Sequence, residues 1–185
     1  MIYKELKNIV MNEIDGVLSS INEESLDRMV ELINECKHND IVVAGAGRMG
    51  YSIKCFGMRL GHLGYNAWTL GDSTVPQIGE GDILIVASGS GETQTIYDIV
   101  VKAKNNGANV ILITTNKESR MSKLADHIVL MNAISAFTGD RGTIQPMKTY
   151  VEQSLLILLD IIALKIMKVT GEDNLSMSKR HSLLE

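Results

Sequence analysis

The chain has 185 residues, enough for one domain with a sizeable core, and its 45% apolar and 22% charged residues are ordinary for a globular protein. Its net charge of −4 argues against nucleic acid as a main partner, because a phosphate backbone binds to a basic surface. The N-terminus has no signal-peptide core, and Asp160 interrupts the longest apolar run well short of the ~20 residues that span a bilayer. Cys36 and Cys55 form no CxxC pair, zinc spacing or disulfide framework. We therefore expect a cytoplasmic protein with buried free thiols, no metal site and no membrane contact.

Two amphipathic helices are predicted at the start of the chain, over residues 3–19 and 23–38. The second follows Asn22, a preferred N-cap residue. Five short apolar runs come next and are predicted to be strands: 41–45, 66–70, 83–87, 110–114 and 127–131. The helix-like segments between these runs cover 48–63, 92–106 and 119–125.

Strands that alternate with helices imply a parallel sheet covered on both faces, so we predict a doubly wound α/β domain with a five-stranded parallel sheet flanked by helices. Residues 132–146 show no periodicity and are expected to form a long loop. A long helix is predicted over 146–169, and its apolar face is broader than one sheet usually covers, so it should also pack against another subunit. The chain is thus predicted to be a single domain, 1–185, divided into an N-terminal helical segment (1–39), an α/β core (40–145) and a C-terminal helix and tail (146–185).

The first glycine-rich loop, GAGRMG, directly follows the first predicted strand. Gly45, Gly47 and Gly50 have the G-x-G-x-x-G spacing of dinucleotide-binding loops, and Asp72 follows 22 positions after Gly50, close to where such a domain holds a ribose. An NAD-dependent oxidoreductase is therefore one hypothesis, although the chain has no second domain for a substrate. A different phosphate ligand is the alternative.

A second loop, ASGSGETQT, links the third predicted strand to the next helix. Ser88, Ser90 and Thr93 supply three hydroxyls within six residues, and Gly89 lets the backbone approach a ligand closely. The N-terminus of the helix adds N–H groups and a positive dipole end. This combination favours a phosphate-monoester site. The alternative is a Gly/Ser turn in which Thr93 caps the helix.

Two loops at the carboxyl ends of neighbouring strands can face one small ligand. In the first loop, Arg48 can bind phosphate or sugar hydroxyls, and Gly47 and Ser52 are further candidates for contact with the ligand. A solvated arginine at the start of a helix is the alternative for Arg48. Under this interpretation the first loop is one wall of a sugar-phosphate pocket.

Three motifs, GAGRMG, SGSGET and SKLADHIVLM, together resemble the sugar isomerase (SIS) domain family. The segments CFGMRLGHLGY, QPMKTYVEQSLLILLD and KRHSLLE further resemble the 6-phospho-3-hexuloisomerases of that family. The resemblance covers nearly the whole chain. The first loop departs from the more common SIS pattern because Met49 stands where a hydroxyl residue is usual.

The resemblance implies the conversion of D-arabino-3-hexulose 6-phosphate into fructose 6-phosphate through a cis-enediol, with neither a cofactor nor a metal. A base must take the proton from C2 and return it at C3. Glu152 is our candidate, because a carboxylate beside an apolar helix face is a better base near neutrality. Its spacing alone fits a solvated first-turn glutamate equally well, and the resemblance favours the base. Gln153 is a candidate to orient the substrate or Glu152.

Two histidines are further candidates for the site. His181 is predicted to act as an acid or base in ring opening or hydroxyl proton transfer, and the resemblance implies that such a histidine can come from a neighbouring subunit. A frayed, solvated C-terminus is the alternative. His62 either contacts the substrate or packs at the end of its helix. The resemblance also implies a homotetramer.

Two other functions remain open at this point. The chain could be a non-catalytic SIS protein that binds a phosphosugar and regulates a partner, or it could isomerise another sugar phosphate. No DNA-binding segment is recognised in the sequence, and the presence of Glu152 with His181 favours catalysis. The resemblance is compatible with both directions of the reaction, toward formaldehyde assimilation in a ribulose monophosphate pathway or toward pentose supply.

Overall fold

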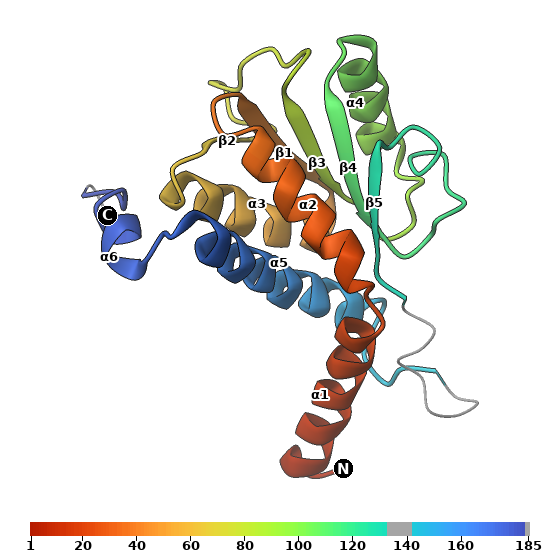
Figure 1. Cartoon of the computed structure of the whole chain (residues 1–185). Helices are drawn as coiled ribbons and strands as arrows, with labels where there is room; N and C mark the ends of the chain where they lie inside the picture. The colour runs from red at the N-terminus through yellow and green to blue at the C-terminus, as the bar shows by residue number, and fades with distance from the viewer. Residues whose placement is uncertain (133–141, 184–185) are drawn as a thin grey trace.

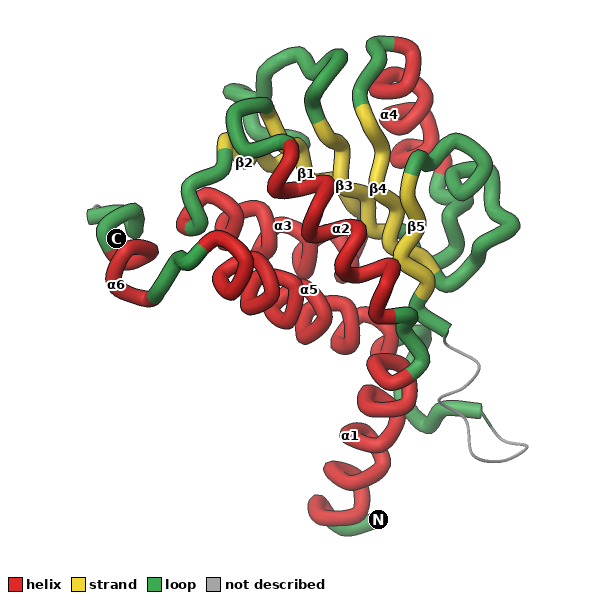
Figure 2. The backbone as a smooth tube through the Cα atoms, in the orientation of Figure 1, coloured by secondary structure: helices red, strands yellow, loops and turns green. Residues whose placement is uncertain are grey.

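The structure is a computed structural model that describes residues 1–132 and 142–183. Within these residues, the centre is a five-stranded parallel sheet with the strand order β2-β1-β3-β4-β5 (Figure 2). The strands are β1 (Asp40–Gly45), β2 (Asn66–Thr69), β3 (Ile83–Ala87), β4 (Asn109–Thr114) and β5 (His127–Leu130). Gly45 pairs with Ala87, so the carboxyl ends of β1 and β3 lie side by side. The predicted parallel sheet is confirmed.

Helices cover both faces of this sheet (Figure 1). The helices are α1 (Tyr3–Ser19), α2 (Glu23–Glu35), α3 (Gly47–His62), α4 (Gln94–Asn105), α5 (Thr149–Thr170) and α6 (Asn174–Ser178). α2, α3 and α5 pack on one face, and α4 packs on the other. Side chains alternate along β1, so that Ile41 and Val43 belong to the core under α3 and α5, whereas Val42 and Ala44 belong to the core under α4. Both faces are therefore buried, as the apolar strands predicted.

Residues 119–125 are predicted as a helix, but the structure shows a series of turns there, so this prediction is wrong. The Ser122 hydroxyl donates to the carbonyl of Asn116, and the Ser122 N–H donates to the Ser119 hydroxyl. The Met121 N–H donates to the carbonyl of Gly91 in the second glycine-rich loop. These bonds compete with the bonds of a helix, and they pack the turns against that loop.

The C-terminal region differs from the prediction in two further ways. The long helix begins at Thr149 and not at 146, and the short helix α6 follows it. Of the predicted loop over 132–146, residues 133–141 lie outside the described residues.

Both cysteines are free thiols. Cys36 is buried, as predicted, but Cys55 is exposed on α3, so the prediction of a buried thiol is wrong there.

Helix α1 extends away from the rest of the molecule (Figure 1). Its buried side chains all lie in its second half, where it packs against α5. Apolar side chains remain exposed on α1, on its N-cap residue and on α5: Ile2, Tyr3, Leu6, Met11, Leu156, Ile157, Ile161 and Leu164. The predicted contact of α5 with another subunit stays a prediction, and these side chains fit it. Among the described helices, none is long and apolar enough to cross a membrane.

Candidate functional site

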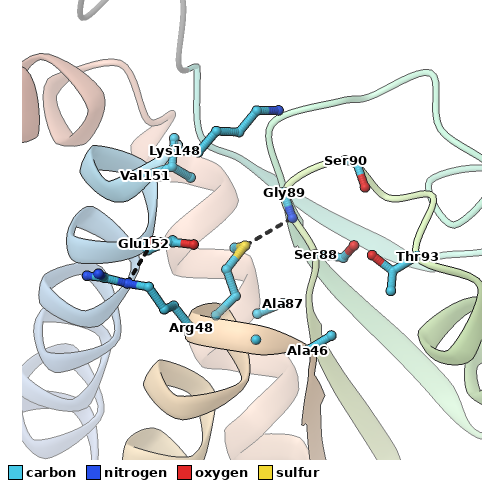
Figure 3. A pocket seen from close by; sticks show the side chains of 12 residues that line it. Ala46, Arg48, Ala87, Ser88, Gly89, Ser90, Thr93, Lys148, Val151 and Glu152 are labelled. Atoms are coloured by element: carbon cyan, nitrogen blue, oxygen red, sulfur yellow. Dashed lines mark hydrogen bonds and ion pairs between the residues drawn. The ribbon is translucent and has the colours of Figure 1, made fainter. Parts of the chain in front are cut away.

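A cavity of about 240 Å³ lies at the carboxyl ends of β1 and β3, next to the first turns of α3 and α5 (Figure 3). Its walls come from both glycine-rich loops and from the start of α5: Ala46, Gly47, Arg48, Met49, Ala87, Ser88, Gly89, Ser90, Thr93, Lys148, Val151 and Glu152. Segments about a hundred residues apart in the sequence thus meet at one edge of the sheet. This is the edge at which open α/β sheets commonly bind ligands.

The three glycines of the first loop are explained by the packing of α3 on β1. A Cβ on Gly50 would lie 2.7 Å from the carbonyl oxygen of Gly45, and a Cβ on Gly45 would lie 3.1 Å from the Cα of Gly50. Gly47 starts α3 with φ = 57°, a left-handed conformation that favours glycine. These contacts bring the first turn of α3 close to the end of β1, and they require no dinucleotide.

The second loop presents hydroxyls to the cavity at the start of α4. Thr93 occupies the N-cap position of α4, but its side chain makes no capping hydrogen bond. The Ser88 and Ser90 hydroxyls accept hydrogen bonds from the N–H groups of Gly91 and Glu92, both at 3.2 Å, which fixes the shape of the loop. The alternative of a simple capped turn does not describe Thr93. Instead, three oriented hydroxyls lie beside a helix N-terminus, the arrangement that suits a phosphate group.

Residues of the segment that follows β4 make hydrogen bonds to the second loop. The Thr115 hydroxyl donates to the carbonyl of Gly89 at 2.7 Å, and the Asn116 side chain donates to the carbonyl of Ser90 at 3.2 Å. Arg120 donates from its backbone and its guanidinium to Glu92, and these hydrogen bonds lower the pKa of the Glu92 carboxyl. The backbone of the second loop is therefore held by hydrogen bonds from three residues of this segment.

Met49 joins the two glycine-rich loops. The Gly89 N–H donates to the Met49 sulfur at 3.0 Å, and the Met49 side chain is 8% exposed (Figure 3). The thioether thus takes the place in which a hydroxyl residue is usual in the first loop. A thioether is a weak acceptor, so a phosphate oxygen is a stronger partner for this N–H group.

Arg48 and Glu152 meet on the other side of the cavity. The Arg48 Nε lies 2.8 Å from the Glu152 Oε2, and the side chains are 59% and 20% exposed (Figure 3). The two atoms form an ion pair, but they are not aligned as a hydrogen bond, and the Glu152 Oε2 has no hydrogen-bond partner among the described residues. The carboxylate is therefore mostly shielded from solvent and lies beside a guanidinium at the edge of the cavity.

Two predicted site residues are adjacent to the cavity without lining it. The Ser52 hydroxyl donates to the carbonyls of Arg48 and Glu152, so it lies between α3 and α5. The Gln153 Oε1 is buried and has no hydrogen-bond partner in the described part of the chain. Ser52 thus connects the two helices that carry the Arg48–Glu152 pair, and its hydroxyl is used by their backbones.

His62 and His181 lie together, but far from the cavity of their own chain. Their rings stack with centroids 5.1 Å apart, and Arg180 donates to the carbonyl of His62 at 2.9 Å. His62 stands at the end of α3, whereas Arg48 stands at its start, 14 residues or about 21 Å of helix away. Within one chain these histidines therefore cannot touch a ligand in the cavity.

Lys148 is a cavity residue that the sequence analysis missed. It is the N-cap residue of α5 and extends from there toward the loop that carries Gly89 and Ser90 (Figure 3). A signal was present in the sequence, since Lys148 precedes Glu152 by four residues and such residues share one face of a helix. The missing information was the point at which α5 begins.

The fold and the cavity define a doubly wound α/β domain with a polar ligand site at the carboxyl ends of its strands. The family model of the SIS domain matches residues 32–163. The chain is 38% identical to a 3-hexulose-6-phosphate isomerase of Bacillus subtilis over 178 residues, which is 95% of each chain. It is 33% identical to a 3-hexulose-6-phosphate isomerase of Methanocaldococcus jannaschii, over 92% of this chain and 96% of the relative.

The fold of this chain also matches that of a solved structure over nearly its whole length. A Methanococcus jannaschii protein, whose crystal structure was described as inferring a 3-hexulose-6-phosphate isomerase function, matches with a TM-score of 0.84 and 33% identity. The match covers 98% of this chain and 99% of that one. The chain belongs to the SIS domain family, as its motifs predicted.

Proposed function

We propose that this protein is a sugar-phosphate isomerase that interconverts D-arabino-3-hexulose 6-phosphate and fructose 6-phosphate. One observation carries the proposal: the Glu152 carboxylate lines the same cavity as the hydroxyls of Ser88, Ser90 and Thr93. A phosphosugar held by the hydroxyls would thus extend toward a carboxylate. The names of the relatives, which are 38% and 33% identical over nearly their whole length, supply the choice of substrate.

In this proposal the second loop holds the phosphate, and Glu152 moves the proton. The Glu152 carboxylate takes the proton from C2 of the 3-ketose, the C–H electrons form the C2–C3 double bond, and the carbonyl electrons move to O3. A proton then passes from O2 to O3, the C2–O2 bond becomes the new carbonyl, and Glu152 returns its proton at C3, so that no proton is gained or lost overall. Negative charge develops on the sugar oxygens in the transition state, and the Arg48 guanidinium, 2.8 Å from the carboxylate, lies where it can stabilise that charge. The reaction involves no net oxidation, so it requires no redox cofactor, and proton transfer by side chains requires no metal.

Ring opening of fructose 6-phosphate is a separate step, for which we propose His181 of another subunit, with His62 stacked beside it. The distance of this pair from the cavity of its own chain argues for an assembly in which it faces the cavity of a neighbour. The exposed apolar side chains of α1 and α5 supply surfaces for that assembly. We accordingly propose a homo-oligomer, and a tetramer is the expected form. The cytoplasm is the proposed location.

The test is an isomerase assay with the purified protein and D-arabino-3-hexulose 6-phosphate, without NAD or added metal. Replacing Glu152 with Gln should lower kcat by about 10²–10⁴-fold, the usual contribution of a general base, while the affinity for fructose 6-phosphate changes little. Glu24→Gln is the control, because it removes a carboxylate from an exposed position of α2, away from the cavity and from the exposed apolar side chains of α1 and α5. A wild-type rate in Glu152→Gln would show that another group is the base.

The same assay separates the alternatives. In D₂O, an enediol route should place deuterium on C3 of fructose 6-phosphate after prolonged equilibration, whereas a direct hydride shift would leave C3 fully protonated. A protein that binds fructose 6-phosphate but never converts the 3-ketose would be a phosphosugar-binding regulator. Thermal stabilisation by NAD and not by fructose 6-phosphate would favour the oxidoreductase.

A further inference from the structure

Helix α1 carries a buried carboxylate that the proposed reaction does not use. Glu13 is 7% exposed, and it lies four residues after Ile9 and four before Val17, on the apolar face of the helix. Burial of a carboxylate is costly unless hydrogen bonds compensate for the lost water. A carboxylate at such a position therefore requires strong partners.

Those partners come from the segment that leads into α5. The Thr143 hydroxyl and the Gln145 side-chain amide donate to the Glu13 Oε2 at 2.6 and 2.7 Å, and the Ile144 N–H is 3.4 Å from the Oε1. Gln145 is itself only 8% exposed, and its N–H donates to the Thr143 hydroxyl at 2.9 Å. We call Glu13, Thr143 and Gln145 the Glu13 cluster. Hydrogen bonds to a charged acceptor are the strong ones, so the cluster fixes this segment to α1.

Only three residues separate the Glu13 cluster from α5. Met147 has φ = 58°, a conformation that costs a non-glycine residue about 1–3 kcal/mol and persists only where the surroundings impose it. The Thr149 hydroxyl donates to the carbonyl of Pro146 at 2.6 Å on the other side of Met147. Lys148 thus stands between two anchored points, and its carbonyl accepts the N–H of Glu152 at 3.2 Å. Lys148 therefore directly follows a segment that is fixed to α1, while the buried side chains of Tyr150 and Val151 hold the first turn of α5 from its other end.

The charged residues that line the cavity indicate the role of Lys148. Among the lining residues that the structure describes, Arg48 and Lys148 are the cations and Glu152 is the anion. Arg48 is paired with Glu152, and the hydroxyls of the second loop carry no charge. A phosphate monoester carries a charge of about −1.5 to −2 at neutral pH. Lys148 supplies a further positive charge that can balance that anion, and its side chain extends toward the second loop (Figure 3).

We propose that Lys148 binds the phosphate of the substrate and that the Glu13 cluster is the positioning device that sets Lys148 over the second loop. Glu13 does not touch the ligand and acts through Lys148. The proposal rests on the proposed function only in its choice of fructose 6-phosphate as the ligand, because any phosphosugar would engage the same charge. Since the phosphate is bound equally in the ground state and the transition state, the loss of Lys148 raises KM and leaves kcat nearly unchanged.

The test is a double-mutant cycle measured by calorimetric binding of fructose 6-phosphate. Lys148→Ala should weaken binding by about tenfold to hundredfold, the value of one charged hydrogen bond. Thr143→Val, which removes a donor to Glu13 at nearly constant volume, and Glu13→Gln should each weaken it by about three- to tenfold. Thr143→Ser should restore wild-type binding, and Asp15→Asn, at an exposed position of α1, is the control for a lost charge. In the Lys148→Ala background, Thr143→Val should have no further effect.

Wild-type affinity for fructose 6-phosphate in both Thr143→Val and Glu13→Gln would overturn the role of the cluster. The same conclusion would follow if Thr143→Val weakened binding by the same factor in the Lys148→Ala background as in the wild type. Should Glu13→Gln fail to fold, the Thr143→Val and Thr143→Ser pair decides by itself. Wild-type affinity in Lys148→Ala would overturn the phosphate contact, as would a wild-type protein that binds neither fructose 6-phosphate nor inorganic phosphate. A protein with the predicted binding cycle that fails to isomerise the 3-ketose would refute the proposed reaction and leave this inference intact.

Discussion

Gly50→Ala tests the interpretation of the G-x-G-x-x-G loop as a packing motif. The new methyl group would lie 2.7 Å from the carbonyl oxygen of Gly45 and 3.0 Å from its carbonyl carbon. Both are backbone atoms, which cannot rotate away as the end of a side chain can. The first turn of α3 must therefore move away from β1, and Arg48 moves with it.

The size of the effect follows from two opposing contributions. Overpacking costs about 1–3 kcal/mol, whereas alanine in a helix gains about 0.5–1 kcal/mol over glycine. A net loss of about 1 kcal/mol remains at the centres of these ranges and about 2.5 kcal/mol at most, which lowers Tm by about 2–4 °C and at most about 10 °C for a chain of this length. Gly61→Ala in the same helix is the matched control: a Cβ there meets no atom within 4 Å, so only the helix gain applies and Tm should rise by about 1–4 °C.

Differential scanning calorimetry should show a lower Tm for Gly50→Ala and a higher Tm for Gly61→Ala. Steady-state kinetics measures the effect of each substitution on the candidate site. A shift of Arg48 by a fraction of an ångström should lower kcat/KM of Gly50→Ala by about tenfold to hundredfold, while Gly61→Ala keeps the wild-type value. If Gly50→Ala were as stable and as active as Gly61→Ala, the close approach of α3 to β1 would not explain the glycine, and the packing argument would fail.

Two further predictions concern the C-terminal region. Hydrogen bonds from Arg180 and Ser176 lower the pKa of Glu172 from 4.5 to about 2, so the stability that this carboxylate contributes should be fully present above pH 4.5 and be lost as the pH falls toward 2. The difference in thermal midpoint between wild type and Glu172→Gln should accordingly shrink over that interval, and a constant difference would contradict the assignment. If His181 serves the cavity of a neighbouring subunit, mixing Glu152→Gln with His181→Ala subunits should restore activity above that of either variant, because some mixed sites hold both intact residues. Light scattering gives the subunit count, and mixed oligomers without restored activity would argue against a shared site.

The sequence predicted the fold well because the relevant signals are local and repeated. Each buried strand is a continuous apolar run, and the alternation of strands with helices leaves a parallel sheet as the simple solution. The second loop was predictable for the same reason, since its hydroxyls, its glycines and the helix after it are contiguous. A sequence pattern is enough to predict a feature when all the residues that form it are neighbours in the chain.

Residues that act through the fold could not be predicted in this way. Ser119 and Ser122 lie in a stretch with helical spacing, yet their hydroxyls bind the local backbone, and the Met121 N–H is used by the second loop. Lys148 lines the cavity only because α5 starts beside the ends of β1 and β3. Glu13 is 130 residues from Thr143 in the chain, and no local pattern pairs them.

The glycine motif of the first loop indicates the backbone geometry more clearly than it indicates which ligand is bound. Gly45 and Gly50 allow a helix to start against the end of a strand, and any α/β domain that binds a ligand there benefits from the same close approach. What differs between such domains is the set of side chains that then face the ligand. Here Arg48 pairs with a carboxylate from α5, and the neighbouring loop offers hydroxyls. The proposed isomerase requires a carboxylate opposite a group that can bind phosphate, and a dinucleotide domain does not. The partner of Arg48 therefore carries more information about the proposed function than the three glycines do.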